Sequence, residues 1–279
     1  ISTNGGKRKK LVFSTLQGFL SDGRAALVGK WAYDIDCENG DPRLIVSLAE
    51  QTGFSNLIPS IIYYVQHRVR CLEAIMKLYG VEKDTAKRLP NTLCYGGSET
   101  TWRDNFGLPE VANTLTGEQH EAMDKVLRIG GELKALMEKL FVHERFKCTV
   151  VRERERLEKE AAMRKRSPKP EVQKAAKTSY GITSSLMSHI VQTCEDTVLG
   201  IVDKTLFSLG WDVLALIFDG LLAMPTTHEG WRAQNGEPVP MQSALAAAQS
   251  ACEMEGWNIV LAEKPLHGKY QTADDPLPT

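Results

Sequence analysis

Two aspartates that lie far apart in the sequence each belong to a short apolar segment that is typical of a β-strand. Asp36 lies in residues 31–37, WAYDIDC, and Asp219 lies between two apolar runs in residues 212–225, DVLALIFDGLLAMP. An Asp-Gly dipeptide between apolar runs favours a tight β-hairpin, which would place Asp219 at the tip of a buried ribbon. Two carboxylates brought together from separate strands are a common site for the pair of divalent metals used in phosphoryl transfer.

A structural role is the alternative for each of these acidic residues. Most Asp-Gly turns are only turns, and it is the second acidic strand that favours a site here. Asp34 lies two residues before Asp36 and therefore shares its face of the strand. It is either a third acidic group of the site or a buried carboxylate held by hydrogen bonds.

Length and charge limit the classes of protein that this chain can represent. Its 279 residues are 42% hydrophobic, which is enough for one large core or two modest domains. It carries 34 basic and 35 acidic residues, a net charge near −1. This balance argues against a protein that binds nucleic acid through its whole surface, so any such binding must use local patches.

The cysteines and the hydropathy pattern indicate a reduced, intracellular protein, cytoplasmic or nuclear. The six cysteines are scattered and form no C-x-x-C pair, so we expect no structural zinc site. No apolar run is as long as a membrane span, so no membrane partner is expected. The basic residues 7–10 are a nuclear localisation signal, a phosphate contact or a solvated N-terminal tail.

The order of expected elements is strand, helices, hairpin, helix, strand. Hydrophobic periodicity and capping residues predict helices over 43–51, 60–79, 116 to about 165 with a break or bend at Gly130-Gly131, 184–209 and 241–256. Strands are expected at 31–37, in the hairpin and at 259–262. This order predicts an α+β domain with an insertion of helices.

Residues 152–169, RERERLEKEAAMRKRSPK, form the most highly charged stretch of the chain. Alternating Glu and Arg usually mark a solvated helix face. The residues Arg164, Lys165 and Arg166 follow without acidic neighbours, which makes them better candidates for contacts with nucleic-acid phosphates.

Three segments resemble the motifs of family A DNA polymerases. Residues 36–43, DCENGDPR, resemble motif A, D-x-x-x-x-E-x-R, with Asp41 in place of Glu. Residues 83–96 resemble motif B, R-x-x-x-K-x-x-x-[F/Y]-x-x-x-Y-G. Residues 218–220, Phe-Asp-Gly, stand where the family has His-Asp-Glu, motif C. The motifs occur in the family's order, at similar gaps, and on the expected kinds of element.

The resemblance covers roughly residues 11–266 and implies a polymerase-type palm with an antiparallel sheet and a mostly helical fingers insertion. Residues 34–42, DIDCENGDP, resemble the form found in a divergent virus- or plasmid-type branch of the family. The implied organisation is a flexible lead-in at 1–10, palm at 11–55, fingers and connecting helices at 56–180, and palm again at 181–279. An exonuclease and most of a thumb are absent, so additional domains or subunits are expected to supply them.

The activity implied by the resemblance is DNA-directed DNA synthesis, in which dNTPs are added to the 3′ end of a primer on a template. Two Mg²⁺ ions, or Mn²⁺ in their place, would be bound by Asp36, Asp219 and the backbone carbonyl of Cys37 or Ile35. Lys83 and Lys87 would hold the triphosphate, unless they form an ordinary solvated basic face.

The resemblance also implies a site for the nucleotide sugar. Asp41 and Tyr95 would exclude a ribose 2′-hydroxyl, and Arg43 would hold the Asp41 carboxylate or form an ordinary salt bridge. Asn91 stands where the family has an aromatic residue against the sugar. Gln192 corresponds to a residue that contacts the primer–template minor groove, although a polar helix surface is the favoured interpretation there.

Other departures from the family pattern affect substrate choice more than reaction type. Pro90 lies inside motif B, so the helix either starts later or is kinked. Gly220 removes the second acid of motif C, and Phe218 replaces a histidine. Asp41 is one methylene shorter than Glu, and a difference of that size discriminates by only about 1–3 kcal/mol. We therefore expect a preference for dNTPs with weaker exclusion of NTPs.

Three other interpretations remain open at this point. The chain could synthesise RNA, as a primase or a single-subunit RNA polymerase. It could be a polymerase-shaped nucleic-acid-binding protein without catalysis, although that role gives no reason to keep both Asp36 and Asp219. It could also be an unrelated α+β protein with chance motif matches.

Overall fold

A computed structural model of the chain describes residues 32–108, 114–174, 178–217 and 220–264. The backbone contacts divide the chain into two compact units. The first unit comprises residues 1–38, 199–251 and 261–279, and the second comprises 39–198 and 252–260. The predicted domain boundaries after residues 55 and 180 stay a prediction. The predicted lead-in at 1–10 lies outside the described residues, as does the stretch up to Trp31.

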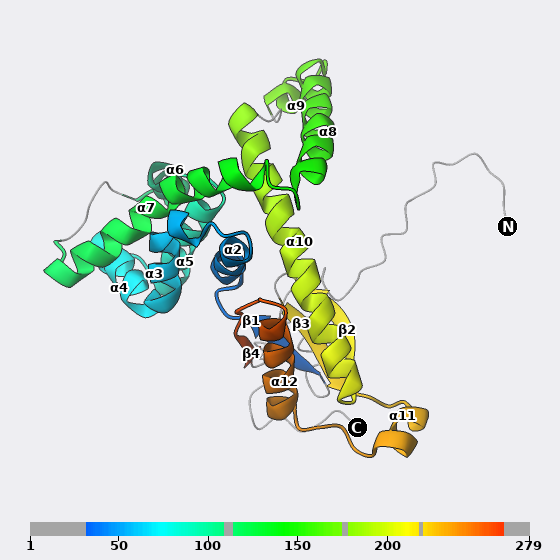
Figure 1. The fold of residues 1–279 in the computed structure, drawn as a ribbon. Helices are drawn as coiled ribbons and strands as arrows, with labels where there is room; N and C mark the ends of the chain where they lie inside the picture. Colours follow the sequence, from blue (N-terminus) through cyan, green and yellow to red (C-terminus); the bar gives the residue numbers. More distant parts are fainter. Residues whose placement is uncertain (1–31, 109–113, 175–177, 218–219, 265–279) are drawn as a thin grey trace, which may run out of the picture. The chain divides into compact units, whose positions relative to one another are not determined.

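The first unit is built on a four-stranded antiparallel sheet (Figure 1). Its strands are β1 (Tyr33–Cys37), β2 (Trp211–Ile217), β3 (Gly220–Pro225) and β4 (Leu261–Lys264), in the order β2-β3-β1-β4. Together with the helices of the chain, this antiparallel sheet confirms the predicted α+β class. Because β1 lies between β3 and β4, both of its edges are hydrogen-bonded.

The predicted hairpin is present as the β2–β3 pair, in which Ile217 is opposite Gly220. One detail of the prediction is wrong, because Gly220 is the first residue of β3 and not part of the turn. Phe218 and Asp219 lie outside the described residues.

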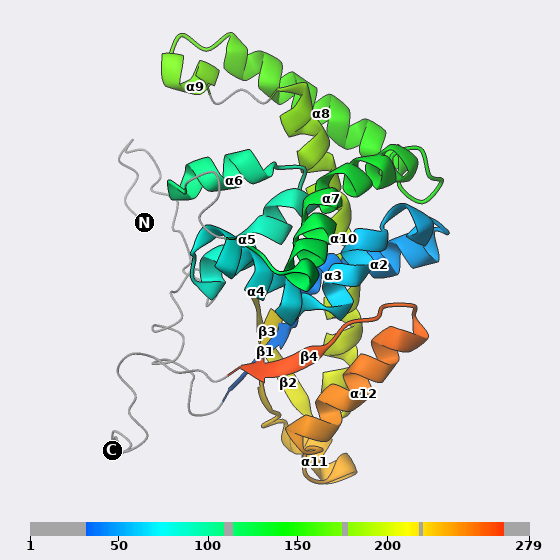
Figure 2. The same cartoon turned by 90° about the vertical axis from the view of Figure 1, so that its left-hand side faces the viewer.

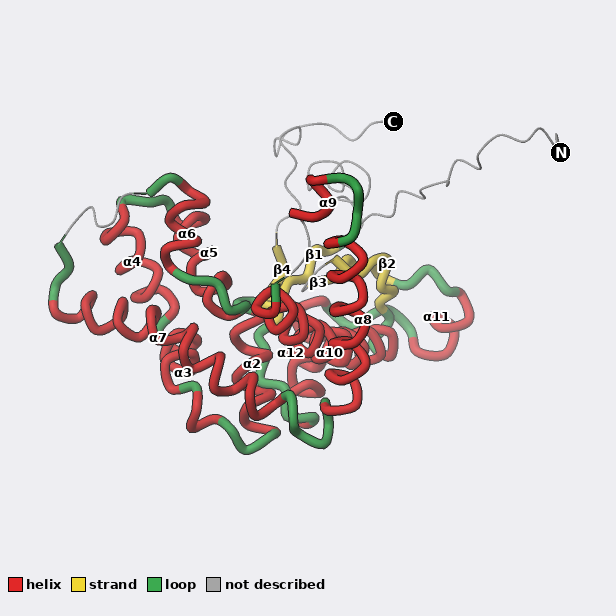
Figure 3. The backbone as a smooth tube through the Cα atoms, turned by 90° about the horizontal axis from the view of Figure 1, so that it is seen from above, coloured by secondary structure: helices red, strands yellow, loops and turns green. Residues whose placement is uncertain are grey.

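One face of this sheet is covered by helices. Figure 3 shows α12 (Met241–Met254) and the end of α10 (Ser179–Ser208) on the same side of the strands. Apolar residues of these strands and helices are buried, namely Ile35, Leu221, Val202, Leu206, Ala244 and Ala248. The short helix α11 (Glu229–Asn235) follows the hairpin.

The second unit is helical (Figure 2). It contains α2 (Gly40–Gln51), a 3-10 turn at Ser55–Leu57, α3 (Pro59–Gln66), α4 (Arg68–Tyr79), α5 (Lys83–Cys94), α6 (Glu99–Phe106), α7 (Gly117–Leu140), α8 (Lys147–Lys165), α9 (Pro170–Lys174) and the first part of α10. Helix α7 packs against α3, α4 and α5. Its side chains Ile129, Leu133 and Leu136 are completely buried, so α7 forms the centre of this core.

The segment 252–260 belongs to the second unit because it is bound to α2. The Nε2 amide of Gln51 donates to the Gly256 carbonyl at 2.9 Å. The hydroxyl of Ser47, a completely buried polar residue, accepts from the Asn258 backbone N–H at 2.9 Å. The buried hydroxyl therefore has a partner, as a polar group in a core requires.

Several helix boundaries follow the predicted signals and others do not. The capping box at Thr116 and Gln119 is formed, and α7 begins at Gly117, directly after Thr116. The expected break at Gly130-Gly131 is wrong, because α7 continues to Leu140. The chain leaves helical structure after Leu140 and resumes it at Lys147.

The single helix predicted over 60–79 is two helices, α3 and α4. They meet at His67, whose φ of −121° and ψ of 34° lie outside the helical region. The predicted end at Gly80 is confirmed, since Gly80 adopts a left-handed conformation with φ of 64°. Pro90 lies inside α5, so the alternative that this helix starts after the proline is wrong.

All six cysteines are free, and Cys148 is the one that is exposed. No helix within the described ranges is long and apolar enough to cross a membrane.

Gly220 allows β3 to approach β1 closely. A Cβ atom at this position would overlap the Ile35 carbonyl oxygen and would lie 3.3 Å from the Asp36 Cα. Both neighbours are held in the central strand, so neither can move without disturbing the ladder. The absence of a side chain at position 220 is therefore a condition for this strand pairing.

We expect Gly220→Ala to lower the free energy of unfolding by about 1–3 kcal/mol, because overpacking a tight site costs that much. Urea denaturation followed by circular dichroism measures the change. The control is Gly131→Ala in α7, where nothing lies within 4 Å of the new methyl group. Alanine favours a helix by up to about 1 kcal/mol over glycine, so the control should gain stability. An unchanged midpoint for Gly220→Ala would contradict the close approach.

Candidate active site

Asp36 is fixed by hydrogen-bonded strands on both sides. In the sheet register it is opposite Gly220 of β3 and Ala262 of β4. Its carboxylate is partly exposed and forms an ion pair with the Lys264 ammonium. Asp34 lies two residues earlier on the same face of β1 and is half-buried. One face of β1 therefore carries two carboxylates.

Only some of the residues predicted to bind metal lie within the described part of the chain. Asp219 lies outside the described residues, so its predicted proximity to Asp36 stays a prediction. The residue that follows it, Gly220, is directly opposite Asp36. The Cys37 thiol is buried, and Cys37 is opposite Leu261. The predicted role of the Cys37 carbonyl is untested.

The donor set at Asp36 is compatible with magnesium. Among the residues that the structure describes, no group of three His, Cys, Asp or Glu side chains lies together. A magnesium ion needs only one or two carboxylates, because it keeps several of its water ligands. Asp36 already has a cation, the Lys264 ammonium, against its Oδ2 atom. A positive charge is therefore already bound next to the Asp36 carboxylate.

In the second unit, the end of α5 places Tyr95. The N–H of Gly97 donates to the Thr92 carbonyl at 2.8 Å, and the N–H of Gly96 donates to the Leu93 carbonyl at 3.0 Å. With Gly96 at φ of 78°, these bonds form a Schellman motif, which ends the helix at Tyr95. The Ser184 hydroxyl of α10 donates to the Tyr95 carbonyl and holds this end of the helix from a second side.

The structure brings Asp41 and Tyr95 together through a hydrogen bond between their side chains. Burial raises the pKa of Asp41 above its ordinary value of 3.8, and the bond from Tyr95 offsets part of that rise. Burial, followed by the charge of Asp41, raises the pKa of Tyr95 far above its ordinary value. The tyrosine therefore keeps its proton and acts as the donor. Although Asp41 is one methylene shorter than a glutamate, its carboxylate still forms this hydrogen bond with Tyr95.

Helix α5 presents a polar stripe along one face. Lys83, Lys87, Asn91 and Tyr95 follow one another at intervals of four residues and so lie on the same side of the helix. Lys83 and Asn91 are exposed, and Lys87 is half-buried. Lys87 pairs with Asp84 at 3.1 Å, an i,i+3 contact on the helix surface. The stripe is accessible, as the predicted triphosphate and sugar contacts require.

Two polar groups at the start of α2, one on the N-cap residue and one in the first turn, are buried without hydrogen-bond partners in the described part of the chain. They are the Nε atom of Arg43 and the Nδ2 atom of Asn39. The predicted role of Arg43 in holding Asp41 is untested. Asn39 was not predicted as a site residue, and it has a left-handed backbone with φ of 57°. The Asn-Gly dipeptide at 39–40, which predicts a turn after the first strand, is a signal for this conformation.

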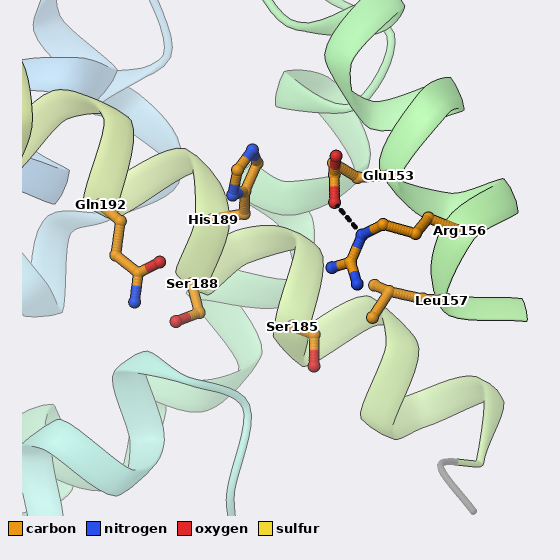
Figure 4. Close-up of a pocket in the computed structure, with 7 residues that line it drawn as sticks. All are labelled: Glu153, Arg156, Leu157, Ser185, Ser188, His189 and Gln192. Atoms are coloured by element: carbon orange, nitrogen blue, oxygen red, sulfur yellow. Dashed lines mark hydrogen bonds and ion pairs between the residues drawn. The ribbon is translucent and has the colours of Figure 1, made fainter. Parts of the chain in front are cut away.

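A cavity of about 230 Å³ lies between α8 and α10 (Figure 4). It is lined by Glu153, Arg156 and Leu157 of α8 and by Ser185, Ser188, His189 and Gln192 of α10. The predicted nucleic-acid residue Gln192 thus lies beside two hydroxyl groups and an imidazole. Arg156 donates to Glu153 at 2.7 Å, and this bond lowers the pKa of Glu153, with smaller contributions that include His189. Residues 185, 188, 189 and 192 recur at helical spacing, so the sequence alone could have predicted that they lie on one face of a helix.

The basic residues at the end of α8 differ from one another. Arg164 pairs with Glu160 at 2.6 Å, so the prediction that it has no acidic neighbour is wrong. The neighbour lies one helical turn earlier, which a linear view of the sequence does not show. Lys165 and Arg166 are exposed and remain candidates for phosphate contacts.

No family model and no curated protein matches this chain. Among solved structures, the chain is similar to the POL domain of Pol1 from M. smegmatis in complex with DNA primer-template and dNTP, with a TM-score of 0.43 and 11% sequence identity. The similarity covers 84% of this chain and 39% of that one. This chain therefore spans less than half the length of that protein.

We expect Tyr95→Phe to raise the pKa of Asp41 further, because it removes the hydrogen-bond donor and leaves the carboxylate partly buried. The folded-state pKa of Asp41 lies above 3.8. Its contribution to stability is therefore fully present below pH 3.8 and is lost as the pH rises through the raised value. In Tyr95→Phe this loss should extend to higher pH.

Carbon-13 NMR titration of the aspartate carboxyl groups measures this pKa, and Asp41→Asn identifies the signal. Tyr33→Phe, a hydroxyl deletion in the other unit, is the control and should leave the Asp41 signal unchanged. An Asp41 pKa that is the same in Tyr95→Phe and in the unmodified protein would mean that the hydrogen bond is absent in solution.

Proposed function

We propose that this protein is a template-directed nucleotidyltransferase, a DNA-directed DNA polymerase that adds dNTPs to the 3′ end of a primer. The contact between Asp41 and Tyr95 is the observation that carries the proposal. The two residues come from different segments, one resembling motif A and the other motif B. A chance match of two short patterns gives no reason for these two side chains to meet.

The sheet of the first unit supports the same proposal. It places Asp36 opposite Gly220, the residue next to the Asp of the segment that resembles motif C. In this proposal Asp36 and Asp219 bind two Mg²⁺ ions, for which Mn²⁺ can substitute. When bound, such ions activate the primer 3′-hydroxyl and stabilise the leaving pyrophosphate.

The other side chains bind and orient the substrates. Lys83 and Lys87 of the α5 stripe contact the triphosphate as cations. Asp41 and Tyr95 contact the nucleotide sugar. Asn91 contacts the side of the sugar that no aromatic side chain closes. Arg43 is proposed to support this sugar site through its buried Nε donor.

The proposed nucleic-acid interface lies on α8 and α10. Gln192 and the hydroxyls of the α8–α10 cavity are suited to sugar and base edges, because they both donate and accept hydrogen bonds. Lys165 and Arg166 are suited to phosphates, with Arg164 shared between Glu160 and the nucleic acid. The proposed partners are therefore a primer–template and dNTPs.

We expect Asp36→Asn and Asp219→Asn each to abolish primer extension while DNA binding is largely retained. Each substitution removes the charge of a metal ligand and leaves the basic residues in place. A labelled primer–template with Mg²⁺ and either dNTPs or NTPs measures extension, and a gel shift measures binding. The control is Asp124→Asn, which loses a surface ion pair with Arg128. Full extension by either variant would exclude the assigned metal ligands, and no extension by the unmodified protein would favour a binding protein without catalysis.

RNA synthesis is the second candidate, and the exposure of Asn91 favours it because no aromatic side chain closes the sugar site at that position. We expect Asp41→Ala to reduce the preference for dATP over ATP by about five- to a hundredfold, since weak steric discrimination has this size. Asp41→Glu should strengthen the preference if the longer side chain still reaches Tyr95.

Competition between dATP and ATP on one template, analysed by product mobility, measures the preference. Asp124→Ala serves as the control. A preference that is the same in Asp41→Ala and in the unmodified protein would remove Asp41 from the sugar site.

A further inference from the structure

Lys264 of β4 reaches across the sheet to Asp36. In the register Lys264 is opposite Asp34, and Asp36 is opposite Ala262. Residues opposite each other in an antiparallel pair share a face, so Lys264 lies on the face that carries Asp34 and Asp36. Its ammonium group contacts the Oδ2 atom of Asp36, the diagonal neighbour.

The two partners of this ion pair differ in how firmly they are held. The Asp36 side chain is 19% exposed and is attached to the central strand of the sheet. The Lys264 side chain is 56% exposed, and its four-carbon stem is flexible. If the pair opens, the lysine moves into solvent and the carboxylate stays in place.

An ammonium group and a divalent cation cannot occupy the same side of one carboxylate oxygen. Two positive charges within a few ångströms repel each other, and the Asp36 oxygen offers its charge to only one of them at close range. A divalent ion that binds Asp36 must therefore displace Lys264 from Oδ2 or bind more weakly while the lysine remains.

We propose that Lys264 is a displaceable occupant of the cation position at Asp36. It holds the carboxylate in place when no metal is bound, and it leaves when a divalent ion binds. The free energy of the ion pair is then subtracted from that of metal binding, so Lys264 weakens the metal affinity of the site. This inference rests on the proposed role of Asp36 as a metal ligand.

A series of substitutions at position 264 tests this proposal, with Mn²⁺ binding to the full chain as the readout. Electron paramagnetic resonance of the free ion, together with isothermal titration, gives the affinity without any need for activity. Asp36→Asn defines the part of the binding that depends on Asp36.

We expect affinity to increase in the order Lys ≈ Arg < Met < Glu. Lys264→Met should tighten binding by roughly two- to fivefold, which corresponds to the strength of a partly exposed ion pair. Lys264→Glu should tighten it further, on the order of tenfold, because it replaces a competing cation by a carboxylate ligand. Lys264→Arg keeps the charge and should bind like the unmodified protein.

The matched control is Lys147→Met, which removes an exposed lysine from an ion pair with Glu144 on α8. It should leave Mn²⁺ affinity unchanged. A purely structural role for Lys264 predicts that the Met and Glu variants bind Mn²⁺ no more tightly than the unmodified protein. That result would overturn this inference and leave the proposed function standing. If no Mn²⁺ binding depends on Asp36 in the unmodified protein or in Lys264→Met, the metal site itself is wrong and the inference falls with it.

Discussion

The central position of β1 is the constraint on which the organisation of this chain depends. β1 is five residues long, and it pairs on both sides with strands from the last third of the chain. The sheet can therefore form only after the many residues between β1 and β3 have been bridged, which carries a loop-closure cost. Most of those residues fold as the separate helical unit around α7. The side chain of Asp36 gains its fixed position from this arrangement, since two strand ladders hold its backbone.

The chain contains two acidic residues of interest that differ in electrostatic character. Asp36 is partly exposed on the central strand of the sheet and already has a cation as its partner. Asp41 is half-buried, its pKa is raised by burial, and its partner is the neutral hydroxyl of Tyr95. A carboxylate in the second kind of environment is poorly suited to bind a metal, because its charged form is disfavoured. It is suited to contact a neutral hydroxyl-bearing group such as a sugar. Two carboxylates only a few residues apart in the sequence thus have different electrostatic environments, one paired with a cation and one with a neutral hydroxyl.

Much of the fold could be predicted because its signals are local. The apolar strands, the hairpin and the capping box at Thr116 depend on residues within a few positions of one another. The division of the helix at His67 carries no glycine or proline signal. The last strand is shifted by two residues from its prediction and ends at Lys264. Because a shift in strand position decides which side chains become neighbours, the ion pair with Asp36 could not be anticipated.

The site was predicted unevenly for the same reason. The meeting of Asp41 and Tyr95 followed from a resemblance between motifs, since no local pattern relates residues so far apart. The acidic partner of Arg164 was missed although it lies only one helical turn away. The unusual backbone of Asn39 is a local feature, yet its buried amide depends on what packs around it.

The close approach at Gly220 also limits how this protein can change over evolutionary time or in the laboratory. The family that the sequence resembles has a glutamate at the corresponding position of motif C. Any side chain at position 220 would meet the Ile35 carbonyl before its carboxylate could reach solvent or substrate. A glutamate at position 220 therefore cannot be introduced without a shift of the backbone. To accommodate an acidic side chain there, the two strands would have to move apart, which requires compensating changes elsewhere in the sheet.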